Sequence, residues 1–326
     1  MNSQTFPEVS TWSGASRIST LVGMAAQGPD AAAFLHGQLS QDVSSLDEHH
    51  ARLGGYCSAK GRLLASAWLM RPAPETVWLW MDASVQATTL KRLSMFVMRS
   101  KLTLRDLSDS STAVGLVGTS AARALAPGSA DALTAPWQSG LVDGLADEGP
   151  AMLVRLPDVL GATRWCWLGP QSRAATVVER VGALPEGSWA WLEVMSGVPR
   201  IEARTADQFV PQMINFELVG GINFKKGCYP GQEIVARSQY RGTIKRRLFL
   251  VHAQAALSPG QEVFSDEDPG QPCGMVVNAA KRPEGGWAAL AEIKLQYAQG
   301  SALTAGLEGV PLTLGSLPYE ITQEDA

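Results

Sequence analysis

The chain has 326 residues, of which 45% are hydrophobic and 18% are charged, and its formal net charge is −4. This composition excludes a disordered tail, and at roughly 100–200 residues per domain the length predicts two or three folded domains. The acidic balance excludes a protein that coats nucleic acid through charge alone, and the lack of a run of ~20 apolar residues or a secretory leader predicts a cytoplasmic protein without a membrane partner.

The first 110 residues alternate between strand and helix signals. Apolar or alternating residues predict strands over 18–26, 53–59, 62–70, 76–81 and 101–107. Gly28-Pro29-Asp30 supplies a turn and an N-cap for a short helix over 31–38, and helical spacing of apolar residues predicts a second helix over 85–98. Lys60-Gly61 is typical of a hairpin turn. This order predicts an α+β domain over 1–110.

The rest of the chain divides into a second α+β domain over 111–242 and a small β-barrel over 243–326. Two stretches rich in Ala, Gly, Pro and Ser, near 121–135 and 140–149, indicate loops or a poorly specified helix. Strands are predicted over 152–156 and 164–168, and helices over 171–181 and 188–195. After residue 243, short apolar runs alternate with turn sequences such as Ser-Pro-Gly and Asp-Pro-Gly, which is typical of a barrel.

The four cysteines lack the C-x-x-C spacing of zinc sites, and we expect all four to be free thiols. Cys57, Cys166 and Cys273 lie in apolar runs, which predicts buried side chains. Cys228 instead lies on a loop with four glycines between 220 and 231 and follows two lysines, whose charge favours a thiolate. It is either a reactive thiol or a side chain that packs beside Tyr229. The sequence assigns it no histidine partner, and no metal site is predicted.

The segment Lys226-Gly227-Cys228-Tyr229-Pro230-Gly231-Gln232-Glu233 resembles the K-G-C-Y-x-G-Q-E signature of the YgfZ family, folate-binding proteins related to the glycine-cleavage T-protein. Upstream, Phe34-Leu35-His36-Gly37-Gln38-Leu39-Ser40-Gln41-Asp42-Val43 and Lys60-Gly61-Arg62 resemble further elements of that family. The resemblance implies an α+β, aminomethyltransferase-like fold of three domains around a central channel. Residues 1–110 would bind folate, 111–242 would carry the signature loop and 243–326 would form the barrel.

The same resemblance implies tetrahydrofolate or a one-carbon derivative as cofactor. It also implies an accessory protein that supports iron–sulfur cluster assembly or repair in client enzymes, including enzymes that modify tRNA. In this interpretation Cys228 is the reactive thiol, activated by Lys226. Whether the thiol meets a cluster, a folate adduct or an oxidant stays open, because one cysteine does not define a cluster site.

A reduced folate presents a flat pterin and an anionic tail, so its site needs an aromatic face, a carboxylate or amide, and a cation. Trp189 lies where family members place a pterin-contacting tryptophan, although a buried core tryptophan is the alternative. Glu193 and Arg237 could supply the carboxylate and the cation, or belong to exposed surface. The predicted cofactor-binding set is completed by Tyr229 beside the thiol, Gln232 and Glu233 holding the loop by hydrogen bonds, and Lys60 on the hairpin.

Two other functions remain open. A folate-dependent one-carbon transferase would need a base other than the Asp pair that follows the hairpin in aminomethyltransferases, because Leu63-Leu64-Ala65 stands there. We therefore expect no glycine-cleavage aminomethyl transfer, and the lack of a G-x-G-x-x-G fingerprint leaves an oxidative version without its cofactor. A tRNA-binding module is supported by a basic run, which the protective charges of an exposed β-edge also explain: Arg237, Arg241, Lys245, Arg246 and Arg247.

Overall fold

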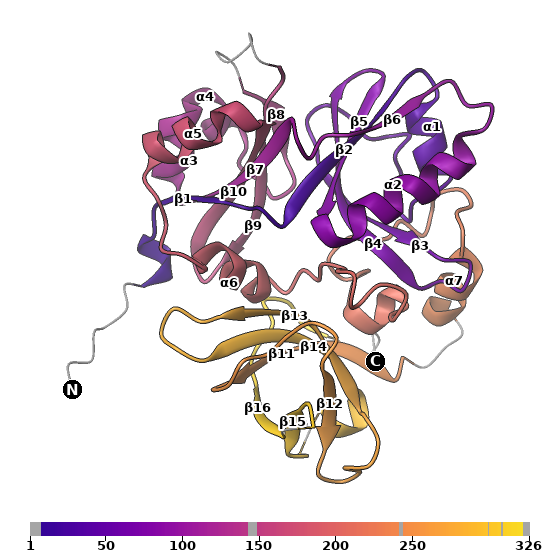
Figure 1. Ribbon diagram of the computed structural model, residues 1–326, viewed down its shortest axis with the longest axis vertical. Coiled ribbons are helices and arrows are strands. Elements are labelled where there is room, and N and C mark those ends of the chain that lie inside the picture. The colour runs from indigo at the N-terminus through magenta and orange to yellow at the C-terminus, as the bar shows by residue number, and fades with distance from the viewer. Residues whose placement is uncertain (1–7, 143–148, 241–243, 299, 308, 322–326) are drawn as a thin grey trace. The chain divides into compact units, whose positions relative to one another are not determined.

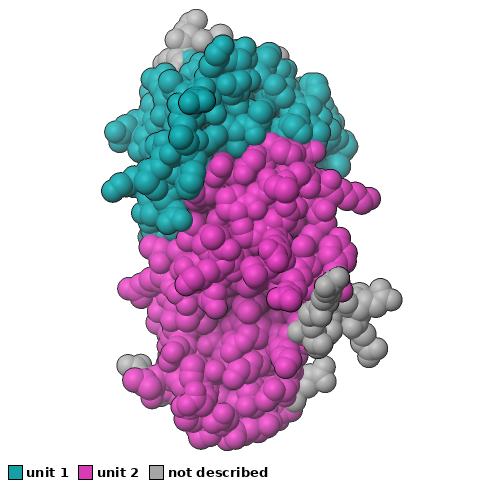
Figure 2. All heavy atoms as spheres, turned by 90° about the vertical axis from the view of Figure 1, so that its right-hand side faces the viewer, with its two compact units in different colours: residues 1–35, 43–52, 68–189 teal, residues 36–42, 53–67, 190–326 magenta. Residues whose placement is uncertain are grey.

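The computed structural model describes residues 8–142, 149–240, 244–298, 300–307 and 309–321 (Figure 1). Each of two compact units combines separate stretches of chain (Figure 2). Unit 1 comprises residues 1–35, 43–52 and 68–189, and unit 2 comprises residues 36–42, 53–67 and 190–326. The three-domain boundaries at residues 110 and 242 stay a prediction. None of the described helices is long and apolar enough to cross a membrane.

The N-terminal sheet confirms the strands and helices predicted over residues 18–107. Its strand order is β3-β4-β5-β2-β6. The bounds are β2 Leu21–Gln27, β3 Arg52–Cys57, β4 Leu63–Ala73, β5 Thr76–Asp82 and β6 Thr103–Asp106, with helices α1 Ala31–His36 and α2 Ala83–Val97. Asp82 caps α2, since its carboxylate accepts a hydrogen bond from the Ser84 amide at 3.0 Å.

A second sheet lies wholly in unit 1, with strand order β1-β7-β10-β9-β8. Its strands are β1 Gly14–Arg17, β7 Ser111–Val117, β8 Ser139–Leu141, β9 Met152–Val159 and β10 Ala162–Pro170. Helices α3 Thr119–Leu125, α4 Pro127–Ala132 and α5 Ala174–Val181 share its apolar core. Helix α6, Ser188–Met195, has the predicted bounds.

Of the two alternatives for the stretch near 121–135, loops or a poorly specified helix, the structure shows helix, because α3 and α4 occupy most of it. The alanines that made the stretch look featureless are strong helix formers and bury their methyl groups in the core. Pro127 is the first residue of α4. Proline lacks a backbone N–H, but the N–H groups of the first helical turn have no partner within the helix, so none of its hydrogen bonds is lost there. In the second stretch, β8 occupies residues 139–141, and residues 143–148 lie outside the described part of the chain.

The C-terminal strands close into the predicted barrel, in the order β11-β14-β13-β12-β15-β16 (Figure 1). The bounds are β11 Arg246–Ala253, β12 Glu262–Ser265, β13 Gly274–Lys281, β14 Trp287–Lys294, β15 Leu303–Ala305 and β16 Val310–Leu314. Strand β11 pairs with β14 on one side and β16 on the other, so it is not the exposed edge that its charges suggested. The barrel interior is an apolar core of Val, Ala, Leu and Ile side chains.

The basic run at the start of β11 is not a free cationic face. Arg247 is fully buried and pairs with Glu217, and Arg246 donates to both carboxylate oxygens of Glu292 at 2.8 and 2.9 Å. Arg237 and Lys245 are exposed, and Arg241 lies outside the described residues. Two of the five cations therefore serve ion pairs within unit 2, which removes most of the support that this run gave to RNA binding.

Candidate functional site

The signature loop is held against the 58–61 hairpin by the close approach of two backbones. Gly231 has φ +80°, and a Cβ atom at this position would lie 2.3 Å from the Ser58 carbonyl oxygen and 2.7 Å from Gly61 Cα. Gly61 also has a left-handed conformation, with φ +70°. Only glycine fits such a contact without displacing backbone. Helix α7, Gln232–Tyr240, begins directly after this contact.

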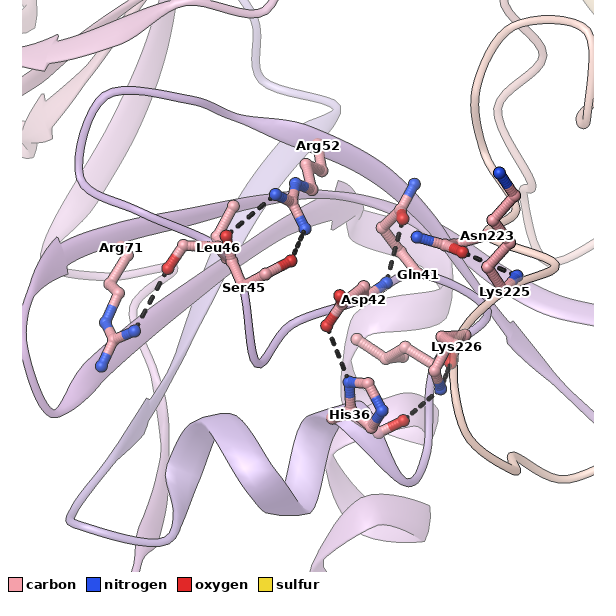
Figure 3. A network of polar contacts seen from close by, with 11 residues as sticks. His36, Gln41, Asp42, Ser45, Leu46, Arg52, Arg71, Asn223, Lys225 and Lys226 are labelled. Carbon is pink, nitrogen blue, oxygen red and sulfur yellow. Dashed lines mark hydrogen bonds and ion pairs between the residues drawn. The ribbon is translucent and has the colours of Figure 1, made fainter.

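Lys226 ties the loop to the end of α1. Its ammonium donates hydrogen bonds to the carbonyl oxygen of Leu39 at 2.8 Å and to that of His36, the last residue of the helix (Figure 3). It also lies 4.9 Å from the centroid of the Tyr229 ring, a cation–π distance. Burial lowers the pKa of Lys226 to about 8, and Asp42 and Cys228 act in the opposite direction. The protonated Lys226 side chain thus holds the loop by hydrogen bonds, and burial lets it lose its proton near pH 8.

We expect the stability of the protein to rise between pH 8 and pH 10.5 through Lys226. In this window the unfolded lysine, with its ordinary pKa of 10.5, is still protonated while the folded lysine is not, so the unfolded state binds more protons and unfolding becomes less favourable as pH increases. The measurement is urea unfolding across this range, compared with Lys226→Met. Parallel pH profiles for the two proteins would contradict the assignment.

Cys228 is the exposed thiol of the chain, while Cys57, Cys166 and Cys273 are buried, and all four are free, as expected. Burial raises the pKa of Cys57 to about 12, which keeps that thiol protonated. Tyr229, next to Cys228, is buried, and its phenol pKa is raised by burial first and by Cys57 second. The loop thus presents its thiol outward and inserts the following aromatic ring into the core.

A histidine and a carboxylate that sequence reasoning did not assign to the loop lie beside it. His36 Nδ1 is 3.0 Å from Asp42 Oδ1 (Figure 3). The Nε2 atom of the same ring lies 3.4 Å from the place that a Cβ atom on Gly227 would occupy. The carboxylate therefore fixes the ring with its other nitrogen facing the residue that precedes Cys228.

The segment 36–42 is bound to the glycine-rich stretch by several further contacts. Ser40 Oγ donates to the Gly221 carbonyl at 2.6 Å, and Gln41 Nε2 donates to the Gly220 carbonyl at 2.8 Å. The backbone N–H of Asn223 donates a hydrogen bond to the Ser40 carbonyl oxygen at 2.9 Å. The signal that could have located His36 and Asp42 was the segment 34–43, whose family resemblance is visible in the sequence. Its contact with residues some 180 positions later is visible only in the fold.

A search of protein-family models finds none that matches this chain. Among curated proteins, the tRNA-modifying protein YgfZ of Cronobacter sakazakii is 32% identical over 252 residues, which is 72% of this chain and 70% of the relative. The protein of the same name from Edwardsiella ictaluri is 30% identical over 320 residues, covering 95% and 93% of the two chains. This chain belongs to the YgfZ family.

The fold is that of the glycine-cleavage aminomethyltransferase T. The crystal structure of this protein from Bartonella henselae superposes with a TM-score of 0.73 at 20% sequence identity, covering 94% of this chain and 86% of that chain. This likeness confirms the predicted aminomethyltransferase-like architecture with its C-terminal barrel.

Four further candidate residues lie on α7 and on the hairpin. Glu233 and Arg237 are exposed on α7, Gln232 is half-buried at its start, and Lys60 is exposed in the turn of the hairpin. The side chains of Gln232 and Glu233 make no hydrogen bond to any described residue, so Lys226, Ser40 and Gln41 hold the loop in their place. Arg237 likewise forms no ion pair within the described ranges.

Two further candidates have their partners outside the loop. Glu193 forms an ion pair with Arg200 at 3.4 Å within unit 2. Trp189 belongs to unit 1, where its indole is 3% exposed, the Arg164 guanidinium lies 5.4 Å from its ring, and a Cβ on Gly115 would meet its ring at 2.2 Å. Trp189 therefore has the surroundings of a core tryptophan, and its contact with a pterin stays a prediction.

Proposed function

We propose that this YgfZ-family chain is a tetrahydrofolate-binding accessory protein that supports iron–sulfur cluster assembly or repair in client enzymes, including tRNA-modifying ones. The observation that carries the proposal is the signature loop. It presents one exposed thiol, Cys228, on a backbone fixed by Gly231, Lys226 and the segment 36–42. A rigid loop with an accessible thiol suits transient contact with a partner or its cluster better than a structural role.

The residues of unit 2 fit the anionic end of a folate better than its pterin. Arg237 offers an exposed guanidinium that forms no ion pair with a described carboxylate, and Gln232 offers an amide at the start of the same helix. Trp189 offers a buried ring that Arg164 already covers. In the proposal, Arg237 and Lys60 bind the glutamate tail of the folate. The other proposed cofactor-binding residues are Glu193, Glu233 and Tyr229. A bound reduced folate would supply a one-carbon carrier.

The alternative of a one-carbon transferase receives less support. The strand that follows the hairpin continues with Leu63 and Ala65, both buried, so it brings no carboxylate to a folate amine. Asp207 reaches the hairpin from another segment, but its carboxylate already accepts a hydrogen bond from Ser58 Oγ at 2.7 Å. Among the described residues, no group of three His, Cys, Asp or Glu side chains is arranged to hold a metal ion. An iron–sulfur cluster that contacts Cys228 would therefore need its other protein ligands from the client enzyme.

The experiment that tests the cofactor is a titration with tetrahydrofolate and 5-formyltetrahydrofolate, followed by tryptophan fluorescence and calorimetry. We expect saturable binding that weakens about 5- to 20-fold in Arg237→Ala, the loss of one charge-assisted contact. Arg180→Ala removes an equally exposed cation from α5 and should leave binding unchanged. Trp189→Ala tests the pterin contact. Lack of binding to either folate would remove the cofactor from the proposal.

Cys228→Ala tests the thiol. We expect normal unfolding and normal folate binding, because the side chain is exposed, but loss of support for an iron–sulfur tRNA-modifying enzyme. The measurement is the level of the modified nucleoside in cells that depend on this chain for it. Cys228→Ser is the matched variant of equal size and should also fail. A normal level of the modified nucleoside with either variant would contradict the proposed role of the thiol.

A further inference from the structure

The end of helix α2 carries an unusual surface that the proposed function does not use. From Ala83 to Arg105 the chain has five cations and no carboxylate, although its overall charge is −4. All five cations are exposed, and none forms an ion pair with a described residue. We call the following exposed residues the α2 tip: Lys91, Arg92, Met95, Phe96, Met98, Arg99 and Lys101.

The α2 tip also exposes large apolar side chains. Met98 is 86% exposed, Met95 60% and Phe96 49%. The opposite face of α2 buries Val85 and Leu93, and the helix contacts β2, β5 and β6 of its own unit (Figure 1). The apolar side chains at the tip are therefore additional to those that attach the helix to the sheet, and the stability of the fold does not explain them.

Helical spacing sets the charged and aromatic side chains of the tip in order. Arg92 and Phe96 are four residues apart on α2, so they lie on the same stripe of the last turns of the helix. The helix ends at Val97, and Arg99 follows in the turn after it. The half-exposed Phe96 ring thus shares its helix face with the Arg92 guanidinium, close in sequence to further cations. The Asp30 carboxylate accepts a hydrogen bond from the backbone amide of Lys101 at 2.7 Å and forms no ion pair with any of the described cations of the tip.

We propose that the α2 tip is a contact surface for unpaired RNA. Cations without acidic partners neutralise phosphates, and an exposed aromatic ring on the same helix face as an arginine stacks on bases that are not paired. A second copy of the chain would bring like charges together. A membrane surface would need a helix whose apolar face is free, whereas α2 buries that face in its own sheet. This inference goes beyond the proposed function, which requires no RNA contact by this chain.

The test uses a fluorescein-labelled RNA hairpin with a seven-nucleotide unpaired loop, and measures anisotropy at 50 and 200 mM salt. We expect Arg92→Ala/Arg99→Ala to weaken binding at least tenfold and to lower the salt dependence by about two counterions, one for each cation removed. Phe96→Ala should weaken binding about 5- to 50-fold with an unchanged salt dependence, because stacking carries no charge. Arg180→Ala/Lys281→Ala removes two exposed cations elsewhere and should bind as the parent does.

Several results would overturn the inference: no binding of the RNA at 50 mM salt, equal binding by the Arg92→Ala/Arg99→Ala variant, or equal affinity for poly-glutamate. Binding to vesicles containing phosphatidylserine, but not to RNA, would overturn it in favour of a lipid surface. Each variant is also titrated with tetrahydrofolate. Unchanged folate binding alongside lost RNA binding separates this inference from the proposed function, and all substituted residues are exposed, so folding is retained.

Discussion

Gly231→Ala is expected to destabilise the signature loop by about 2–5 kcal/mol. The substitution places a methyl group 2.3 Å from the Ser58 carbonyl oxygen and also forces alanine to keep a φ of +80°. Neither neighbour is a flexible side chain, since both contacts are made by the backbone of the hairpin. Urea unfolding measures the loss, and limited proteolysis between residues 224 and 240 shows whether the loop opens first.

Gly270→Ala is the matched control for this experiment. A Cβ at Gly270 would meet no atom within 4 Å, and its φ is not left-handed. Its effect should stay within about 0.5 kcal/mol. If Gly231→Ala were as stable as Gly270→Ala, the loop and the hairpin would not be in backbone contact, and the rigid presentation of Cys228 would lose its basis.

Arg247→Met is expected to cost about 3–5 kcal/mol of unfolding free energy. Arg247 is fully buried, pairs with Glu217, and donates to the Gln212 carbonyl at 2.9 Å. Removing the guanidinium leaves a carboxylate that is 5% exposed without its counter-charge. The barrel strand β11 and the segment before the signature loop should therefore loosen together. Chemical unfolding followed by tryptophan fluorescence provides the measurement.

A double variant distinguishes the loss of an attraction from the burial of an unpaired charge. Arg247→Met/Glu217→Leu removes both charges and should recover most of the stability, because a well-packed apolar pair replaces a buried ion pair at little cost. Arg282→Met breaks an exposed pair with Glu284 and should cost less than about 1 kcal/mol. A similar cost for Arg247→Met and Arg282→Met would show that Arg247 is solvated.

Local patterns predicted the elements well where the chain is strongly patterned. The helix over 188–195 has the predicted bounds, and the alternation of strands with two helices over 18–107 is confirmed. Over 121–135 the sequence did not decide between loop and helix, because the short side chains of α3 and α4 give only a weak apolar pattern. The strands β1, β8, β12, β15 and β16 have three to five residues and were not predicted, because short strands depend on their pairing partners. The longer strand β7 was also not predicted.

The basic run at 237–247 shows why charge read along the chain misled. Five cations in eleven positions indicate an exposed face, but the barrel buries Arg247 and pairs Arg246 with a buried glutamate. A cationic surface whose members form no ion pair with described residues lies at α2, where no acid interrupts the sequence between residues 83 and 105.

The sequence by itself determined the family, the glycine-rich loop and the identity of its exposed thiol, because these depend on residues that are neighbours in the chain. The tertiary structure decided what surrounds that loop. His36 and Lys226 are 190 positions apart, yet the fold joins them by a hydrogen bond, and Asp42 orients the histidine. No local periodicity encodes such a pair, since it depends on how the segment 36–42, the hairpin and the signature loop pack within unit 2.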